Sequence, residues 1–412
     1  MRILLQNQYA GSLAGTESYF MLLIGDLRAM GHEVVCVYTM SGIKADHGIT
    51  KDGVTNYYLP YMEAAVHNFW TDRAALREVK RDVKILMDIV DRHKIDIVHL
   101  NNTRYPFLYA ALKEKVPLVQ TLHDYFHVCP TLLKLLGREG RPICTHKMGL
   151  PCLKEKCISL RKPASLATLA MGMRNRTAIK RFDLIFVTTS HMKDTMVRNG
   201  FKADKVIVNP LYVKVEKDSF SVADNETKPL ILYVGRVAEE KGLDDFLLAL
   251  KHLDCDFQAQ IIGTGPVLGH IRSTALRYGL GEKVTFSGFL EYKKIIDFYK
   301  KATVVVVPSI WPEPFGMVGI EAMSLMRPII AYDVGGISTW LKHGENGYLV
   351  AKNNISMLTQ RINELLCNRK LAKKMGEKGN RLFKADFNCN RHMSALISTY
   401  EDISNRRNSN LL

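Results

Sequence analysis

The fold is decided by one stretch, Thr303-Val-Val-Val-Val307 followed by Pro308-Ser-Ile-Trp-Pro-Glu313-Pro-Phe-Gly-Met-Val-Gly-Ile-Glu321. Its first five residues are a short apolar run, which is typical of a strand that is buried on both faces of a parallel sheet. A turn rich in Pro and Gly then leads into a helical pattern from Met317. A strand, a turn and a helix in this order are the repeating unit of a parallel α/β sheet.

The same alternation runs through the whole chain. In the first half we expect strands at 2–5, 33–38, 95–100, 117–121 and 183–188. In the second half we expect strands at 230–234, 257–262, 283–286, 303–307, 328–331 and 347–350. Amphipathic stretches separate them at 16–30, 71–94, 242–253, 267–278, 292–301 and 317–326. Buried strands that alternate with helices predict doubly wound parallel sheets.

The alternation restarts in the middle, which predicts two domains. A strand-like run ends at Pro210, a polar stretch follows, and Pro229 opens a new strand. We expect an N-terminal Rossmann-like domain at 1–212, a second Rossmann-like domain at 229–385, and a C-terminal helix within 386–412. Two such sheets that face each other create a cleft at the carboxyl ends of their strands, where α/β sheets bind ligands.

Composition limits the class of protein. The 412 residues are 47% hydrophobic and 24% charged, as in an ordinary globular protein. No apolar run reaches the ~18 residues that span a bilayer. The N-terminus has a three-residue apolar run and no small-residue cleavage site, so we interpret it as a strand rather than a signal peptide. The expected location is the cytoplasm, with the option of peripheral binding to the inner face of the cell membrane.

The strongest motif is the Glu313-x7-Glu321 arrangement. Glu313 precedes the turn and Glu321 lies one helical turn past Met317. The backbone N–H groups at a helix start are unpaired and can hold an anion or a hydroxyl. The two carboxylates can accept hydrogen bonds from vicinal hydroxyls, as ribose and pyranose rings offer. The alternative is a capped helix with a chance acidic pair.

A second motif, Gly235-Arg236 with Lys241-Gly242, follows the strand expected at 230–234. Arg236 and Lys241 can both reach one diphosphate and neutralise it as a leaving group. The alternative is a surface loop with solvated cations.

Three weaker signals follow other strands. Gly15 lies in Gly11-Ser-Leu-Ala-Gly-Thr-Glu17, where glycine permits close approach of the backbone to a ligand. His123, followed by Asp124, ends the strand at 117–121 and is expected at the ligand edge of the first sheet. Gly263 belongs to a Gly-x-Gly turn that suits a nucleobase or a phosphate. A helix cap, a structural histidine and a plain tight turn are the respective alternatives.

Together these strings resemble glycosyltransferase family 4, the glycosyl transferases group 1 proteins. The resemblance is specific over about 230–350 and looser in the first half. It implies the GT-B fold, in which an N-terminal acceptor-binding domain and a C-terminal nucleotide-sugar-binding domain face each other across a cleft, and in which the C-terminal helix packs back on the N-terminal domain. It also implies transfer of a sugar from a nucleotide-diphosphate sugar, of the UDP or GDP type, with retention of anomeric configuration and without a metal cofactor.

The resemblance assigns roles residue by residue. Arg236 and Lys241 would hold the diphosphate, Glu313 the donor sugar and Glu321 the ribose. His123 would lie beside the reacting sugar. The remaining donor contacts would come from glycines and backbone N–H groups, at Gly15, Gly235, Gly263, Phe315, Gly316 and Met317. We expect a lipid-linked or growing surface-polysaccharide sugar as the acceptor.

Two alternatives remain. One is another enzyme of the same fold, such as a nucleotide-sugar epimerase. The other is a nucleic-acid binder, suggested by a net charge of +16, although we find no stacking platform and expect no nucleic acid as a partner. The formal metal motif Asp254-Cys-Asp256 lies between a helix and a strand, and we interpret it as a turn.

An insert at about 127–182 combines cysteines with basic residues. Cys129, Cys144, Cys152 and Cys157 are separated by 14, 7 and 4 residues. Four thiols in ~30 residues suggest a structural zinc, with reduced thiols or disulfides as alternatives. Residues 134–181 also carry twelve Lys or Arg and two acids, a local charge of +10. Beside an apolar stretch at 164–173, this charge suits an anionic membrane surface, or else a core-facing helix with solvated cations.

Overall fold

A computed structural model of the chain describes residues 1–10, 15–39, 45–59, 73–137, 141–159, 161, 163–214 and 228–409. The chain forms two compact units. The first comprises Met1–Pro210 with Asn390–Leu412, and the second comprises Leu211–Cys389. Most of the linker expected at 210–228 lies outside the described residues.

The first unit is built on an eight-stranded sheet with the order β3-β4-β2-β1-β5-β6-β7-β8. Its strands are β1 Arg2–Asn7, β2 Glu33–Tyr38, β3 Ala45–Lys51, β4 Val54–Tyr58, β5 Ile97–Leu100, β6 Leu118–Leu122, β7 Leu184–Val187 and β8 Val206–Val208. All neighbours pair in parallel except β3 and β4. The strand order reverses between β1 and β5, and ligands of α/β sheets bind at such a point.

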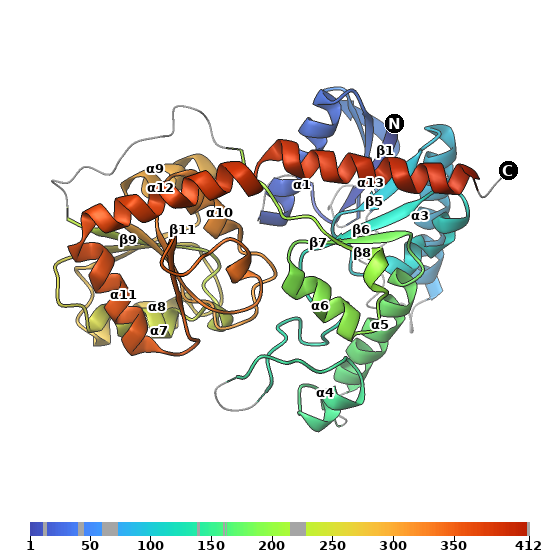
Figure 1. Cartoon of the computed structure of the whole chain (residues 1–412). Helices are drawn as coiled ribbons and strands as arrows, with labels where there is room; N and C mark the ends of the chain where they lie inside the picture. Colours follow the sequence, from blue (N-terminus) through green and yellow to red (C-terminus); the bar gives the residue numbers. More distant parts are fainter. Residues whose placement is uncertain are drawn as a thin grey trace. The chain divides into compact units, whose positions relative to one another are not determined.

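Helices connect and cover these strands. They are α1 Gly15–Ala29, α3 Arg73–Arg92, η2 Pro106–Glu114, α4 Leu150–Lys154, α5 Pro163–Ile179, α6 Ser190–Arg198 and η3 Ala203–Lys205. The last helix of the chain, α13 (Cys389–Ser409), runs along this sheet (Figure 1). Its Tyr400 is fully buried and packs edge-on against His99 of β5 and Phe186 of β7. The C-terminal helix therefore completes the core of the first unit.

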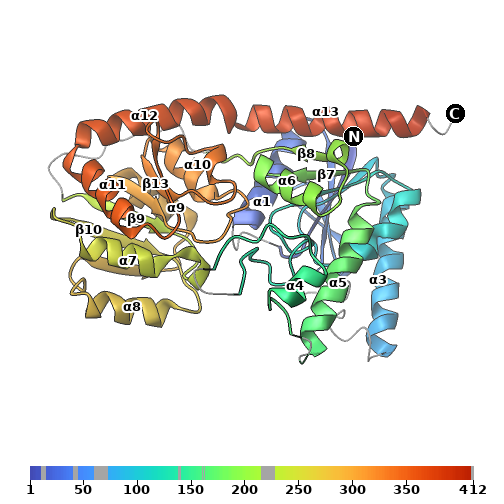
Figure 2. The same cartoon turned by 60° about the horizontal axis from the view of Figure 1, so that its bottom comes forward.

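The second unit has a six-stranded parallel sheet with the order β11-β10-β9-β12-β13-β14. Its strands are β9 Leu230–Val234, β10 Gln258–Ile262, β11 Val284–Gly288, β12 Val304–Val307, β13 Ile329–Tyr332 and β14 Gly347–Val350. Its helices are η5 Glu239–Lys241, α7 Leu243–Lys251, α8 Leu268–Arg277, α9 Tyr292–Lys301, α10 Met317–Ser324, η6 Ile337–Thr339, α11 Ile355–Cys367 and α12 Arg369–Asp386. Figure 2 shows α7 and α8 on one side of this sheet, and α10 and α12 on the other.

The predicted pair of doubly wound α/β sheets is confirmed. The core strands are buried on both faces, as at β12, because helices cover both sides of the sheet. The edge hairpin of β3 and β4 was not predicted, although the sequence has a signal for it. Asp52 and Gly53 join the two strands with positive φ angles of 51° and 73°, and Asp-Gly is a preferred pair for a two-residue hairpin turn.

Candidate functional site

The switch point of the second unit carries the strongest motifs. The strand order reverses between β9 and β12, which pair directly with each other. Gly235–Lys241 follows β9, and the stretch from Pro308 to Gly316 follows β12. Two loops that are 70 residues apart in the sequence therefore lie side by side where α/β sheets bind ligands.

Lys241 and Glu313 form the centre of this arrangement. The ammonium Nζ of Lys241 donates to Glu313 Oε1 at 2.5 Å, and both side chains are largely buried, with 19% and 7% exposed. The hydroxyl of Ser309 donates to the same carboxylate oxygen at 2.5 Å. Burial acts to raise the pKa of Glu313, but the charge of Lys241 and hydrogen bonds from Lys241, Ser309 and Trp311 outweigh it, so the pKa is lowered. Glu313 is therefore an ionised acceptor with a fixed position.

Arg236 lies on the same loop and remains accessible. Its guanidinium pairs with the buried carboxylate of Glu240, yet 57% of its side chain is exposed. Its backbone oxygen accepts a hydrogen bond from the Tyr233 hydroxyl at 2.8 Å. The charges of Glu313, Glu240 and Arg236 all act on Tyr233, whose pKa is raised chiefly by burial. Because a guanidinium has five N–H donors, Arg236 can bind an anion while it stays paired with Glu240.

Glycines bring these loops into contact. Gly263 has a φ of 137°, and a Cβ atom there would lie 1.9 Å from the backbone oxygen of Gly235. Gly242 has a φ of 68°, and a Cβ atom there would lie 2.0 Å from the backbone oxygen of Pro308. Both positions combine a left-handed backbone with a neighbour that any side chain would strike. The close approach of the β9, β10 and β12 loops therefore requires glycine.

The start of α10 is held rigidly. Gly316 caps the helix with a φ of 84°, and the indole Nε1 of Trp340 donates to Phe315 O at 2.6 Å. Gly319 lies against the Trp340 ring, where a Cβ atom would approach within 2.5 Å. The N–H groups of Met317 and Val318 precede the first hydrogen bond of the helix, which Gly319 N–H donates to Gly316 O at 2.9 Å, so these two groups are placed to bind an oxygen of a ligand.

Glu321 lies one turn further into α10. Its Oε2 accepts a hydrogen bond from the Tyr299 hydroxyl at 2.8 Å. Burial raises the pKa of Glu321, and the bond from Tyr299 lowers it only in part. The structure thus pairs Glu313 with Lys241, and it holds Glu321 separately through α9.

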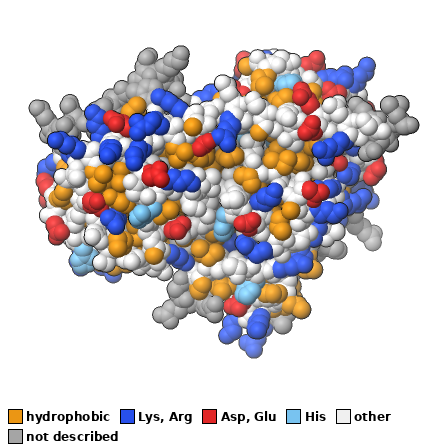
Figure 3. Space-filling view, viewed as in Figure 1, with side chains coloured by type: hydrophobic (Ala, Val, Ile, Leu, Met, Phe, Trp, Pro, Cys, Tyr) orange, Lys and Arg blue, Asp and Glu red, His pale blue; other side chains and the backbone are white. Residues whose placement is uncertain are grey.

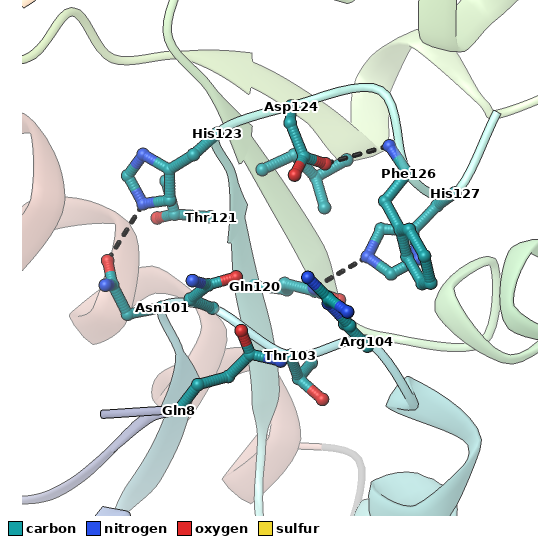
Figure 4. A pocket seen from close by; sticks show the side chains of 12 residues that line it. Gln8, Asn101, Thr103, Arg104, Gln120, Thr121, His123, Asp124, Phe126 and His127 are labelled. Carbon is teal, nitrogen blue, oxygen red and sulfur yellow. Dashed lines mark hydrogen bonds between the residues drawn. The ribbon is translucent and has the colours of Figure 1, made fainter. Parts of the chain in front are cut away.

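A second polar site lies at the carboxyl edge of the first sheet (Figure 4). His123, directly after β6, donates from Nε2 to Asn101 Oδ1 at 2.9 Å. Asn101 in turn donates from Nδ2 to Asn7 Oδ1 at 3.1 Å. Burial and the nearby His392 lower the pKa of His123 to about 4. His123 is therefore neutral at physiological pH, with Nδ1 as the acceptor nitrogen.

This site is a small polar cavity of about 100 Å³. Asp124, Phe126 and Arg104 line it together with the buried Gln120. The Gln120 Oε1 atom has no hydrogen-bond partner among the described residues. Since a cavity of about 150 Å³ holds benzene, this one takes only part of a sugar-sized ring. Gly15 opens α1 after β1 and is exposed, and Thr16 and Glu17 follow it in the helix; the first part of the predicted motif, 11–14, lies outside the described residues.

The four clustered cysteines are free thiols in this structure. Cys129 Sγ accepts a hydrogen bond from the backbone N–H of Lys134 at 3.3 Å. Cys144 Sγ lies 3.8 Å from Lys134 Nζ. Over the described part of the chain, no three His, Cys, Asp or Glu side chains are grouped so that they could hold a metal ion. The structural zinc stays a prediction.

Part of the basic insert contacts the protein itself. The Arg174 guanidinium lies 3.8 Å from the centre of the Phe107 ring, and Arg176 donates to Met148 O at 2.9 Å. Lys180 lies 5.6 Å from the centre of the Phe201 ring, and its pKa is lowered by burial and by the neighbouring charges of Arg176 and Lys147. A group of cations that repel one another favours an anionic partner.

Several functional neighbours were missed in the sequence. Glu240 directly precedes Lys241, and Ser309 and Trp311 lie inside the quoted stretch, so proximity to the motifs was an available signal. Trp340 and Tyr299 had no local signal, because only the packing of α10 brings them to the site.

Comparison with known proteins defines the class. Residues 214–382 match the glycosyl transferases group 1 family, and residues 14–211 match the glycosyl transferase 4-like domain. An uncharacterized glycosyltransferase of Methanocaldococcus jannaschii is 33% identical over 245 residues, which are 53% of this chain and 68% of that relative. The chain is a glycosyltransferase, and it belongs to the glycosyl transferases group 1 family.

Solved structures share the fold. Sucrose-phosphate synthase from Thermosynechococcus elongatus superposes with a TM-score of 0.73 at 21% identity, over 98% of both chains. Anabaena HepE, solved in complex with UDP, superposes with a TM-score of 0.70 at 16% identity, over 98% of this chain and all of HepE. The predicted GT-B fold is thereby confirmed. Among the described helices, none has the length and apolar character that crossing a bilayer requires.

Proposed function

We propose that this glycosyltransferase moves a sugar from a nucleotide-diphosphate sugar, of the UDP or GDP type, onto a carbohydrate acceptor with retention of configuration. The observation that carries the donor assignment is the buried Lys241–Glu313 pair, with the accessible Arg236 on the same loop. A carboxylate and two cations at one switch point suit the hydroxyls and the diphosphate of such a donor. The complex of HepE with UDP is consistent with this donor class.

In this proposal each side chain has one role. Arg236 and Lys241 bind the diphosphate and stabilise its charge as it leaves. Glu313 accepts hydrogen bonds from the donor sugar, aided by the N–H groups at the start of α10, and Glu321 binds the ribose.

The bond from the anomeric carbon to the diphosphate breaks, and the acceptor oxygen bonds to that carbon on the same face. The acceptor proton passes to the leaving phosphate oxygen. His123, from the first unit, accepts a hydrogen bond at Nδ1 from the reacting sugar. No metal is required for these steps.

Donor binding is the direct test. Thermal unfolding should be measured with a panel of UDP-, GDP- and ADP-sugars, because a ligand at 100 times its Kd stabilises the folded state by about 2.7 kcal/mol. We expect one donor class to raise the melting temperature of the wild type, and Arg236→Ala to abolish the rise. The variant Arg277→Ala, on α8, should respond like the wild type. If no nucleotide sugar stabilises the protein, the proposal is wrong.

Product analysis separates transfer from epimerisation. With the stabilising donor, we expect slow release of free sugar and nucleoside diphosphate, as water replaces the acceptor. Accumulation of an epimeric nucleotide sugar, with no diphosphate released, would instead favour the alternative enzyme. A release of the sugar as the opposite anomer would contradict retention.

We further propose that the acceptor is lipid-linked or part of a growing surface polysaccharide, and that the basic insert binds an anionic membrane. At α4, Leu150 is 81% exposed, and Lys147, Lys154 and Lys156 are exposed around it. Figure 3 shows hydrophobic side chains beside Lys and Arg at its lower end, where Figure 1 places α4. An exposed leucine among cations suits the interface of an anionic bilayer.

Vesicle flotation tests this surface. We expect the wild type to float with anionic phosphatidylglycerol vesicles and not with neutral phosphatidylcholine vesicles. Leu150→Glu should weaken flotation strongly. Leu276→Glu is the matched control, because Leu276 is also an exposed leucine, at 70%, but lies on α8. Equal flotation of the wild type with both kinds of vesicle would exclude the proposed binding.

A further inference from the structure

The C-terminal helix α13 carries His392, which is 4% exposed and lies near His123 of the polar site. His392 Nδ1 lies 2.8 Å from the backbone oxygen of Pro210. Since a carbonyl oxygen can only accept, Nδ1 carries the proton and donates. In the neutral ring Nε2 is then an acceptor, and the Tyr19 hydroxyl, 2.9 Å away, donates to it.

Tyr19 contacts two histidines at once. Its ring lies 5.6 Å from the ring of His123, at an angle of 60°, and 5.4 Å from the ring of His392, at 81°. Tyr19 is 1% exposed and belongs to α1. Buried ring pairs at these separations attract each other beyond the effect of their buried area. The position of Tyr19 therefore determines where the face of the His123 ring can lie.

A second restraint on His123 comes from Asn101, the residue after β5. The His123 ring donates from Nε2 to Asn101 Oδ1, so rotation of the ring about that bond is restrained by the contact on the face of the ring. The hydrogen bond of Tyr19 to His392 supplies this restraint, because it stops the tyrosine ring from moving away from His123. His392 is itself held by Pro210 and by Asn209, whose Nδ2 donates to His392 O at 3.3 Å.

We infer that His392 is a positioning residue: acting through Tyr19, it fixes the ring of His123 in the polar site. This inference rests on the proposed function in one respect, namely that His123 contacts the reacting sugar. The C-terminal helix thereby contributes to the site as well as to the core, although it is the most distant element in the sequence.

The chain contains its own control for this inference. On the same helix, the Tyr400 hydroxyl lies 2.5 Å from His99 Nδ1, and His99 Nε2 lies 2.7 Å from Thr121 Oγ1. This is a second buried tyrosine–histidine pair, and both of its residues are fully buried. Tyr400 makes its ring contacts with His99 and Phe186. Removing the Tyr400 hydroxyl should therefore lower the free energy of unfolding by about as much as removing the Tyr19 hydroxyl, but it should not free the His123 ring to rotate.

The test uses ring ¹⁵N signals of the full-length protein labelled at histidine. We expect Tyr19→Phe, which keeps the ring and loses the hydroxyl, to shift and broaden the His123 signals. His392→Leu should have the same effect, and His392→Gln should restore part of the signal because an amide oxygen can accept from Tyr19. Tyr400→Phe should move the His99 signals and leave those of His123 in place. Unchanged His123 signals in Tyr19→Phe, or equal shifts in Tyr400→Phe, would overturn the inference.

The inference is also tested by enzyme kinetics, with the nucleotide sugar that stabilises the wild type as the donor. We expect Tyr19→Phe to lower kcat about tenfold with KM within about twofold, since a misplaced group loses interactions made in the transition state. If Tyr400→Phe loses as much kcat as Tyr19→Phe does, His392 has only a structural role. If no donor is found, the proposed function fails, while the ¹⁵N comparison still decides whether His392 positions His123.

Discussion

Lys241 is the residue on which the donor site depends, because it links two loops with one ammonium group. Its partner Glu313 is 72 residues away in the sequence. The pair lies largely out of water, so each charge needs the other. The carboxylate also accepts from Ser309, which leaves a donor sugar to compete for its remaining acceptor sites.

Replacing Lys241 by Met should therefore destabilise the protein by about 3–5 kcal/mol, because it leaves a buried carboxylate without a cation. The pKa of Glu313 should rise in this variant, and stabilisation by a nucleotide sugar should be lost. Lys241→Arg should recover part of the lost stability and part of the stabilisation by a nucleotide sugar. Urea unfolding of each variant measures the change. The control is Lys228→Met, which removes an exposed ion pair with Asp256 and should change stability little, because exposed ion pairs contribute little. Equal losses in both variants would refute a special role for Lys241.

At the scale of elements, burial and backbone hydrogen bonds act in opposite directions on the thiols of the insert around α4. Burial raises the pKa values of Cys152 and Cys157, while hydrogen bonds from the backbone of Gly149 and Gly137 act to lower them. Cys129 and Cys144 act electrostatically on both Cys152 and Cys157, which raises the pKa values of these two thiols further. Because the described side chains group no three metal ligands, zinc binding would require some of these thiols to reorient.

We expect the purified protein to contain about one zinc per chain, as four cysteine ligands imply. Cys144→Ser should lose most of the metal and some thermal stability, because the folding of a structural zinc site depends on its metal. Cys255→Ser, in the second unit, should keep the zinc content and the thermal stability of the wild type. Metal analysis by mass spectrometry decides the matter. Zinc far below one per chain in the wild type would mean that the insert is held by packing and hydrogen bonds alone.

At the scale of the whole first unit, three buried histidines and the half-buried His123 couple folding to pH. Burial lowers the pKa values of His99 and His127 to about 3, and those of His123 and His392 to about 4. In the unfolded chain these groups titrate near 6.5. Between pH 6.5 and about 4 the unfolded state therefore binds more protons than the folded state, and stability rises with pH over this range.

The melting temperature should consequently fall as the pH is lowered from about 6.5 towards 4, and it should be insensitive to these groups above pH 7. His392→Gln should flatten this dependence, because one of the titrating groups is gone. His270→Gln provides the comparison, since His270 is an exposed residue of α8. Scanning calorimetry from pH 7.5 to pH 4.5 gives the profiles. If the melting temperature of His392→Gln depends on pH as steeply as that of the wild type, burial does not lower the pKa of His392 as assigned.

The alternation of apolar strands and helical stretches was enough to predict two doubly wound α/β sheets, because strand burial and helix period are local properties of the chain. The motifs Gly235–Lys241 and Glu313–Glu321 are also local stretches of the chain, so the sequence alone was enough to identify them as candidate sites. The β3–β4 hairpin was missed although Asp52-Gly53 marks its turn, because its strands lack the long apolar runs of the core.

What the tertiary structure decided is which distant residues meet. Only the parallel pairing of β9 with β12 brings Lys241 to Glu313. Only the return of α13 to the first sheet places His392 beside Tyr19, and Tyr400 beside His99. Such contacts depend on how whole elements pack, and side chains separated by up to 373 residues carry no local pattern that reveals their partners. The class of fold follows from short-range chemistry, whereas the geometry of both sites follows from long-range packing.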